Sequence, residues 1–169
     1  VTGVDDDLID GTISSLVTVS VVDASSDNNF DPVADQTVSA ATTDNDTAGF
    51  TVVQSGGSTS VAETGSTDTF TVVLNAQPAS NVVISVTSGD TGEATVSTGT
   101  LTFTSGNWNS AQTVTVTGVD DSLVDGSQTT AATISVVDAS SDDNFDGVAN
   151  QTTNIETTDN DSVGFTLVE

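Results

Sequence analysis

The strongest constraint on this chain is an internal repeat. Residues 1–54 reappear as residues 116–169 without an insertion or deletion, and 34 of these 54 positions are identical. A fixed period of this kind is typical of tandem repeat proteins, in which every unit packs in the same way. The chain is shorter than two periods of 115 residues. We therefore expect one complete repeat with parts of two others, as in a window on a longer array.

The charge of the chain is entirely negative. It has 25 Asp and Glu residues and no Lys, Arg or His, which gives a formal charge of −25. No side chain can neutralise phosphate, so the composition excludes nucleic acid and electrostatic attraction to anionic membranes. Two carboxylates about 4 Å apart repel by roughly 4 kcal/mol at an effective dielectric constant of about 20. Clustered acids in this chain therefore need water and distance, or a metal ion.

Cysteine is absent, which excludes disulfides and thiolate metal sites. This absence fits large secreted bacterial proteins that rely on metal ions for stability. No apolar run reaches the roughly 18 residues of a membrane span, so we expect no membrane insertion. Together these features predict an extracellular or cell-surface location.

Alternation of apolar and hydroxyl side chains predicts strands along most of the chain. Turn pairs such as Gln77-Pro78 and Asp125-Gly126 separate them. The predicted strands cover residues 50–53, 69–74, 82–86, 100–103, 113–117, 132–137 and 151–157. Seven or eight short strands per period predict an all-β, immunoglobulin-like antiparallel sandwich.

The period then divides the chain into three predicted segments. Residues 1–48 would hold the last strands of one repeat, and residues 49–163 would form one complete repeat. Residues 164–169 would be the first strand of the next. One repeat of this length suits a single small sandwich domain.

The order of several motifs in this chain resembles that of Calx-β repeats. These motifs are Ser60-Val-Ala-Glu63, Phe70-Thr-Val-Val-Leu74, Gly99-Thr-Leu-Thr-Phe103, Val119-Asp-Asp121 and Asp159-Asn-Asp161. Calx-β repeats are immunoglobulin-like modules of sodium–calcium exchangers, integrin β4 and giant bacterial surface proteins. The resemblance covers about residues 49–163, and the sequence looks most like the tandem arrays of secreted bacterial adhesins.

The resemblance implies a calcium site made of acids from several loops. The implied ligands are Glu63, Glu93, Asp120, Asp121, Asp125, Asp159 and Asp161. Glu93 stands where the family has Asp, and Asn160 stands where it has an acid, which implies a weaker site or fewer ions. The alternative is that these are solvated loop acids. Calcium itself suits the composition, because it takes oxygen ligands and the chain lacks the imidazole and thiolate that zinc, copper or iron favour.

A second acidic cluster lies between the last two predicted strands. Its candidate ligands are Asp138, Asp142, Asn144 and Asp146, of which the last three match the start of an EF-hand-type loop. Thr153 stands where such a loop needs a bidentate Glu. Two interpretations stay open: a partial calcium loop, or a hairpin loop rich in Asx turns.

The first copy repeats the acids of the implied site. Its candidates are Asp5, Asp6, Asp10, Asp44 and Asp46, which lie 115 residues before Asp120, Asp121, Asp125, Asp159 and Asp161. Our hypothesis is that these acids face the acidic hairpin loop of the next repeat in an array. Calcium bound there would rigidify the junction.

We expect a structural protein and no enzyme, because the sequence offers no aromatic pocket beside its paired carboxylates. The predicted function is a calcium-dependent stalk segment of an extracellular adhesin or surface fibre. The alternative is a subunit of a self-assembling filament, in which strands from neighbouring copies complete the partial repeat. The expected partners are neighbouring repeats or copies of the chain itself, and cell-surface or matrix polymers.

Overall fold

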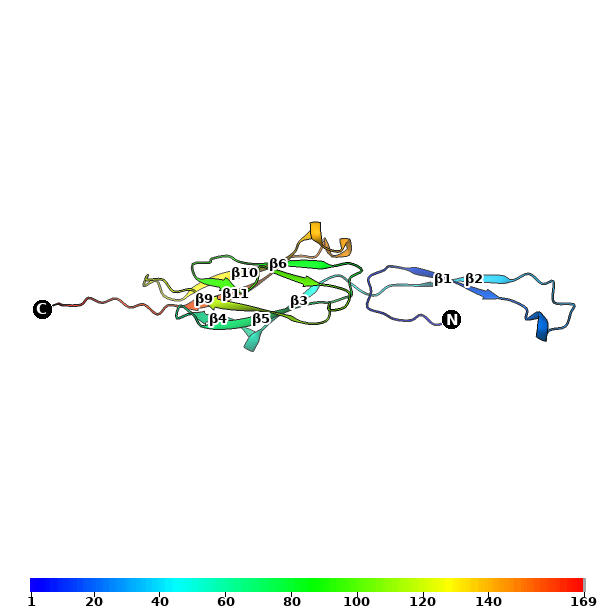
Figure 1. Ribbon diagram of the computed structural model, residues 1–169, viewed down its shortest axis with the longest axis horizontal. Coiled ribbons are helices and arrows are strands. Elements are labelled where there is room, and N and C mark those ends of the chain that lie inside the picture. The colour runs from blue at the N-terminus through cyan, green and yellow to red at the C-terminus, as the bar shows by residue number, and fades with distance from the viewer. Residues whose placement is uncertain (169) are drawn as a thin grey trace. The chain divides into compact units, whose positions relative to one another are not determined.

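The computed structural model describes residues 1–168, which form two compact units, Val1–Asp46 and the chain from Thr47 onward. Both units are built of β-strands joined by loops and single 3-10 turns (Figure 1). These turns are η1 (Asp23–Ser25), η2 (Ser55–Gly57), η3 (Asp138–Ser140) and η4 (Asp143–Phe145). No helix among the described residues is long and apolar enough to cross a membrane.

The second unit is a sandwich of two sheets. One sheet has the strand order β3-β5-β9-β7, and the other has the order β4-β11-β10-β6-β8. The strands are β3 (Phe50–Gln54), β4 (Thr59–Ala62), β5 (Thr67–Leu74), β6 (Val82–Ser88), β7 (Ala94–Val96), β8 (Thr100–Phe103), β9 (Gln112–Gly118), β10 (Gln128–Val136) and β11 (Gln151–Thr158). With β3, β5, β7 and β9 taken as strands A, B, D and E, and β6, β10 and β11 as C, F and G, this is the immunoglobulin arrangement. The predicted all-β, immunoglobulin-like sandwich is confirmed.

One strand pair departs from the predicted antiparallel pattern. β4 runs parallel to β11, with Thr59 opposite Ile155 and Ala62 opposite Thr158. The reason lies in the turn before β4, where Gly56 and Gly57 have φ angles of 63° and 87°. Glycine reaches this left-handed region without a steric penalty, so the chain can leave the sheet of β3 and join the opposite one. β4 and β11, the last strand of the sandwich, therefore end side by side.

The core of the second unit lies between the two sheets. It contains Phe70 and Val72 of β5, Ile84 of β6, Phe103 of β8 and Ile134 of β10, all without measurable exposure. Buried and less buried residues alternate along these strands, as expected for sheets with one face in the core. Threonines at the less buried positions supply β-propensity without adding to the core, whereas Thr130 of β10 is itself buried.

The first unit contains only a two-stranded hairpin, β1 (Ile13–Val19) and β2 (Gln36–Thr42). Its register pairs Ile13 with Thr42 and Val19 with Gln36. In the second unit β10 and β11 pair Gln128 with Thr157 and Ile134 with Gln151, which is the same register shifted by 115 residues. The repeat in the sequence is therefore also a repeat in strand pairing.

The strands observed in the second unit include the ranges predicted from alternation, except that β10 ends at Val136, one residue before the predicted end. The strands β4 and β7, which are four and three residues long, were not among the predicted ranges, because they are too short to show a period. Residues 164–168, predicted as the first strand of a further repeat, form no strand in the structure. Their counterpart β3 is a strand because β5 pairs along its whole length. The predicted domain boundaries stay a prediction.

Candidate metal centre

Three carboxylates meet at one end of the sandwich. Glu63 directly follows β4, and Asp159 and Asp161 are the first and third residues after β11. Since β4 and β11 are parallel and end in register, their following residues lie together. One carboxylate oxygen from each of the three residues lies within 4.8 Å of the others. Glu63 is fully buried and the two aspartates are half-buried. Burying charged carboxylates without a counter-charge raises the free energy of the folded state.

Backbone donors hold this group in place. The Asn160 N–H donates to Glu63 Oε2 at 3.2 Å, and the Asp161 N–H donates to Asp159 Oδ1 at 2.6 Å. The Gly126 N–H donates to Asp159 Oδ2 at 2.8 Å. Gly126 has a φ of 74° and belongs to the loop between β9 and β10. Asp159 thus joins the end of β11 to that loop.

The loop between β9 and β10 carries the next three candidate ligands, Asp120, Asp121 and Asp125. The Asn160 side-chain amide donates to Asp120 Oδ1 at 2.9 Å. Asp121 Oδ1 accepts the N–H of Leu123 at 2.6 Å, which closes a tight turn within the loop. These bonds leave the loop beside the three central carboxylates, where its charges act on them.

Glu93 reaches the same region from the residue before β7. Its backbone carbonyl accepts the Val119 N–H at 2.8 Å, which ties it to the end of β9. Its Oε2 atom is buried and has no hydrogen-bond partner. Asp161 Oδ2 is also buried and without a hydrogen-bond partner. An unpartnered buried carboxylate oxygen is unfavourable, and a bound cation would be one partner that satisfies such atoms.

The pKa values of the acids reflect this crowding. Burial and then the charges of Asp159 and Asp120 raise the pKa of Asp161. Burial and then the charges of Asp125 and Asp121 raise the pKa of Glu93. The acids that raise these two pKa values are therefore those nearest to the unpartnered oxygens of Asp161 and Glu93.

In Glu63 and Asp159, hydrogen bonds from backbone N–H groups oppose the effects of burial and neighbouring charges on the pKa. The Asn160 N–H lowers the pKa of Glu63, but burial and the neighbouring aspartates outweigh it, so that the pKa is raised. The pKa of Asp159 is lowered, mainly because the N–H groups of Asp161 and Gly126 stabilise its charged form. Asp159 is therefore an anchored carboxylate, whereas burial and neighbouring charges disfavour the charged forms of Glu63, Glu93 and Asp161.

The donor set fits a calcium ion. The possible side-chain ligands are carboxylates and the amide of Asn160, and calcium takes six to eight such oxygens from flexible loops. The chain has no Lys, Arg or His that could neutralise the group instead. Asn160 was considered from the sequence only as a missing acid, but in the structure it bridges Glu63 and Asp120. Its place between two aspartates was the signal that could have indicated this role.

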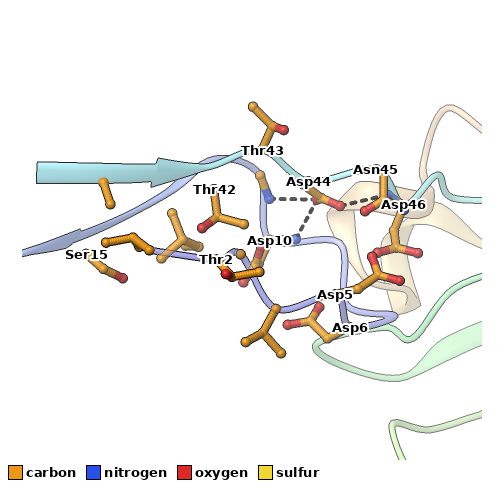
Figure 2. Close-up of a pocket in the computed structure, with 16 residues that line it drawn as sticks. Thr2, Asp5, Asp6, Asp10, Ser15, Thr42, Thr43, Asp44, Asn45 and Asp46 are labelled. Atoms are coloured by element: carbon orange, nitrogen blue, oxygen red, sulfur yellow. Dashed lines mark hydrogen bonds between the residues drawn. The ribbon is translucent and has the colours of Figure 1, made fainter.

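The first unit repeats part of this geometry (Figure 2). Asp44 Oδ2 accepts the N–H groups of Asp10 and Gly11 at 3.0 and 2.8 Å, and its Oδ1 accepts the Asp46 N–H at 2.8 Å. These bonds match those of Asp159. Asp5, Asp6 and Asp46 line the same cavity of about 560 Å³. Burial first, and then Asp44 and the other acids, raise the pKa of Asp46.

The second acidic cluster has a different arrangement. Asp142 is buried, and its carboxylate accepts the Ser80 N–H at 2.8 Å and the Asn144 N–H at 3.0 Å. These bonds make Asp142 the cap of η4 and fix the loop to the chain before β6. Burial raises the pKa of Asp146, and the charges of Asp138 and Asp143 raise it further. In the described part of the chain only Glu63, Asp159 and Asp161 come together closely enough to hold one ion, so calcium binding by this loop stays a prediction.

No family model matches the chain, and neither does any curated protein. Solved structures similar to it include domains 4 and 5 of the S-layer protein SbsC, with 24% identity, 86% of this chain and 57% of that one covered, and a TM-score of 0.47. The apo-form Calx CBD1 domain is 14% identical, with 66% and 98% covered and a TM-score of 0.47. This chain thus spans little more than half of the SbsC structure. Since both TM-scores are below 0.5, the sandwich is assigned from the chain's own strand pairing.

Proposed function

We propose that this chain is a calcium-stabilised structural repeat of an extracellular adhesin or surface fibre, in which it serves as a stalk segment. One observation carries the proposal. Two buried carboxylate oxygens, Asp161 Oδ2 and Glu93 Oε2, have no hydrogen-bond partner at the crowded acidic end of a chain without cationic side chains. A divalent cation from outside would satisfy them.

The position of the acids says what the ion would do. Glu63 and Asp161 follow strands of one sheet, whereas Glu93 and Asp121 adjoin strands of the other. An ion held by Glu63, Asp159 and Asp161 would join the ends of β4 and β11 and, through the bond from the Gly126 N–H to Asp159, the β9–β10 loop. Such a link stiffens a module without any chemical reaction, which suits a stalk.

The affinity expected for the site agrees with an extracellular setting. Calcium sites of extracellular modules have dissociation constants of about 10⁻⁴–10⁻³ M, well above cytosolic calcium. At a concentration ten times the dissociation constant, one bound ion adds about 1.4 kcal/mol to the free energy of unfolding. Several such sites along an array would make the fibre depend on calcium. Its partners would be neighbouring repeats and surface or matrix polymers.

Calcium titration by calorimetry, with thermal unfolding followed in parallel, tests the proposal. We expect heat of binding and a rise in Tm for the natural chain. Glu63→Gln and Asp161→Asn should each weaken binding about tenfold or more, because each removes a charged ligand. Glu156→Gln is the matched control, since Glu156 lies on the exposed face of β11 and outside the cluster. Failure of calcium to change either quantity would refute the proposed function.

A further inference from the structure

The acidic centre at the end of the sandwich contains one neutral side chain, that of Asn160. The backbone N–H of Asn160 donates to Glu63 Oε2 at 3.2 Å, and its side-chain Nδ2 donates to Asp120 Oδ1 at 2.9 Å. Asn160 therefore contacts acids of two other segments, the residue after β4 and the β9–β10 loop. The acids of the centre are Glu63, Glu93, Asp120, Asp121, Asp125, Asp159 and Asp161.

The Nδ2 group of Asn160 is the one side-chain donor to these acids among residues 1–168. Their other hydrogen bonds come from backbone N–H groups, such as that of Gly126 to Asp159. The chain has no Lys, Arg or His that could approach the centre instead. A hydrogen bond to a charged acceptor is stronger than one between neutral groups, so the amide stabilises the carboxylate of Asp120 beside the other acids.

The same bond fastens the β9–β10 loop. Asp120 is the second residue after β9, so the Asn160 amide holds the beginning of the loop. Gly126 lies near the start of β10, and its N–H holds the other end of the loop to Asp159 at 2.8 Å. The loop is thus attached to the end of β11 at two points by neutral donors. Neither attachment needs an ion, so the acids of the loop are brought to the centre before a cation binds.

A carboxylate at position 160 would change two properties of the centre. It would remove the donor to Asp120 and place a second negative charge close to it, which raises the free energy of the calcium-free folded state. With calcium present, it would offer a further charged oxygen, and calcium affinity depends on the number of charged ligands. Compared with an acid, asparagine at this position therefore lowers the affinity for calcium and stabilises the fold without it.

We infer that the Asn160 amide takes the place of a cation at Asp120 when calcium is absent, and so sets how strongly the fold of the second unit depends on calcium. The first part of this inference rests on the two hydrogen bonds of Asn160. The second part rests on the proposed function. A stalk segment with this residue keeps its fold when calcium is withdrawn, and calcium adds stability to a centre that is already assembled.

Two variants that add the same charge test the inference. Asn160→Asp replaces the amide inside the centre, whereas Asn154→Asp adds a charge on the exposed face of β11, outside the centre. In a buffer with chelator at neutral pH, Asn160→Asp should have a Tm about 3 °C or more below that of Asn154→Asp. Calorimetric titration should show that Asn160→Asp binds calcium about tenfold more tightly than Asn154→Asp does, because it adds a charged ligand.

A third variant separates the loss of the amide from the gain of a charge. Asn160→Ala removes the donor to Asp120 and adds no charge. Without calcium, the amide hydrogens of Leu123 and Gly126 should exchange about threefold faster or more in this variant than in the natural chain, because the loop has lost one of its two attachments. This measurement keeps the test decisive if Asn160→Asp does not fold in chelator. Recovery of that fold on adding calcium would support the inference.

The possible failures of the inference and of the proposed function are distinguishable. Unchanged exchange in Asn160→Ala, or equal Tm values of the two charge variants in chelator, would overturn the role of the amide at Asp120. Equal calcium affinities of the two charge variants would overturn its influence on calcium dependence. Absence of calcium binding by the natural chain would refute the proposed function, and the measurements in chelator would still decide whether the amide holds the loop.

Discussion

The hairpins β1–β2 and β10–β11 are the same local structure in two environments. They share their register, and the loop turns agree as well: Phe30 and Phe145 each donate an N–H to the carbonyl of an Asp three residues earlier, at 2.8 Å in both. The Asx turns of Asp27 and Asp142 also match. What differs is burial, which only the second hairpin obtains from other strands. Register and turn geometry are therefore local properties of this sequence, whereas the core is not.

The differences between the two copies are concentrated in the strands rather than in the loops. From Ile13 to Val19 only Thr18 is identical to its counterpart, whereas the segment from Ser20 to Asp27 is identical throughout. Turns tolerate few residue types at each position, because specific donors and backbone angles define them. Strand positions accept any β-forming residue that packs against the partner strands. The repeated acids of the loops thus carry more structural information than the strands do.

The largest expected difference in stability between matched variants of the two hairpins is at the loop phenylalanines, Phe30 and Phe145. Phe145→Ala should lower the free energy of unfolding of the second unit by about 3–5 kcal/mol, because it leaves a cavity under a fully buried ring. Phe30→Ala should change stability by no more than about 0.5 kcal/mol, because the ring is mostly exposed. Chemical denaturation of both variants measures this. Similar losses in the two variants would mean that the first hairpin is already covered.

A smaller difference in stability is expected between alanine variants of two matched glycines, Gly3 and Gly118. A Cβ on Gly118 would lie 2.2 Å from the Ala62 carbonyl oxygen, whereas one on Gly3 would meet only the Thr42 side chain, at 3.2 Å. Gly118→Ala should therefore destabilise the second unit by about 1–3 kcal/mol, as overpacking does. Gly3→Ala should have little effect, since a side chain can move away. Thermal unfolding distinguishes these outcomes, and a stable Gly118→Ala variant would show that β4 does not pack closely on β9.

The sequence predicted the sandwich and most of its strands, because alternation is a direct consequence of one buried face. Its period also predicted the matching hairpins. It could not predict β7 or the parallel pairing of β4, since both depend on how distant strands meet. Gly56 and Gly57 indicated a turn but not the change of sheet that they permit.

In the candidate site, too, the sequence predicted some residues, whereas other roles depend on tertiary structure. Glu63, Asp159 and Asp161 were predicted as ligands from a resemblance, and the structure brings these three together. The bridging role of Asn160 and the anchoring of Asp159 by Gly126 were not predictable, because they depend on the relative position of three loops. Asp142 looked like a ligand by its spacing, but its burial and its bond to the Ser80 N–H arise from tertiary packing.

The smallest expected contrast is in pH dependence without calcium. The folded second unit raises the pKa of Glu63, Glu93 and Asp161 above their ordinary values of 4.5, 4.5 and 3.8. Just above those values the folded state then holds more protons than the unfolded state. The free energy of unfolding consequently falls as the pH rises through this range. Asp68, Asp142 and Asp159 have lowered pKa values and act in the opposite direction, because their stabilisation is lost as the pH falls below the ordinary range.

The calcium-free second unit should therefore have its highest Tm at mildly acidic pH and a lower Tm at both neutral and strongly acidic pH. Replacing Glu63 and Glu93 together by Gln should remove most of the loss towards neutral pH, because these acids no longer ionise. The matched change in the first unit, Asp46→Asn, should leave this transition unchanged, since that unit has no counterparts of Glu63 and Glu93. Thermal unfolding in metal-free buffers measures these profiles. A Tm that rises steadily to neutral pH would show that the acidic end is not strained by its own charge, and that calcium has no repulsion there to relieve.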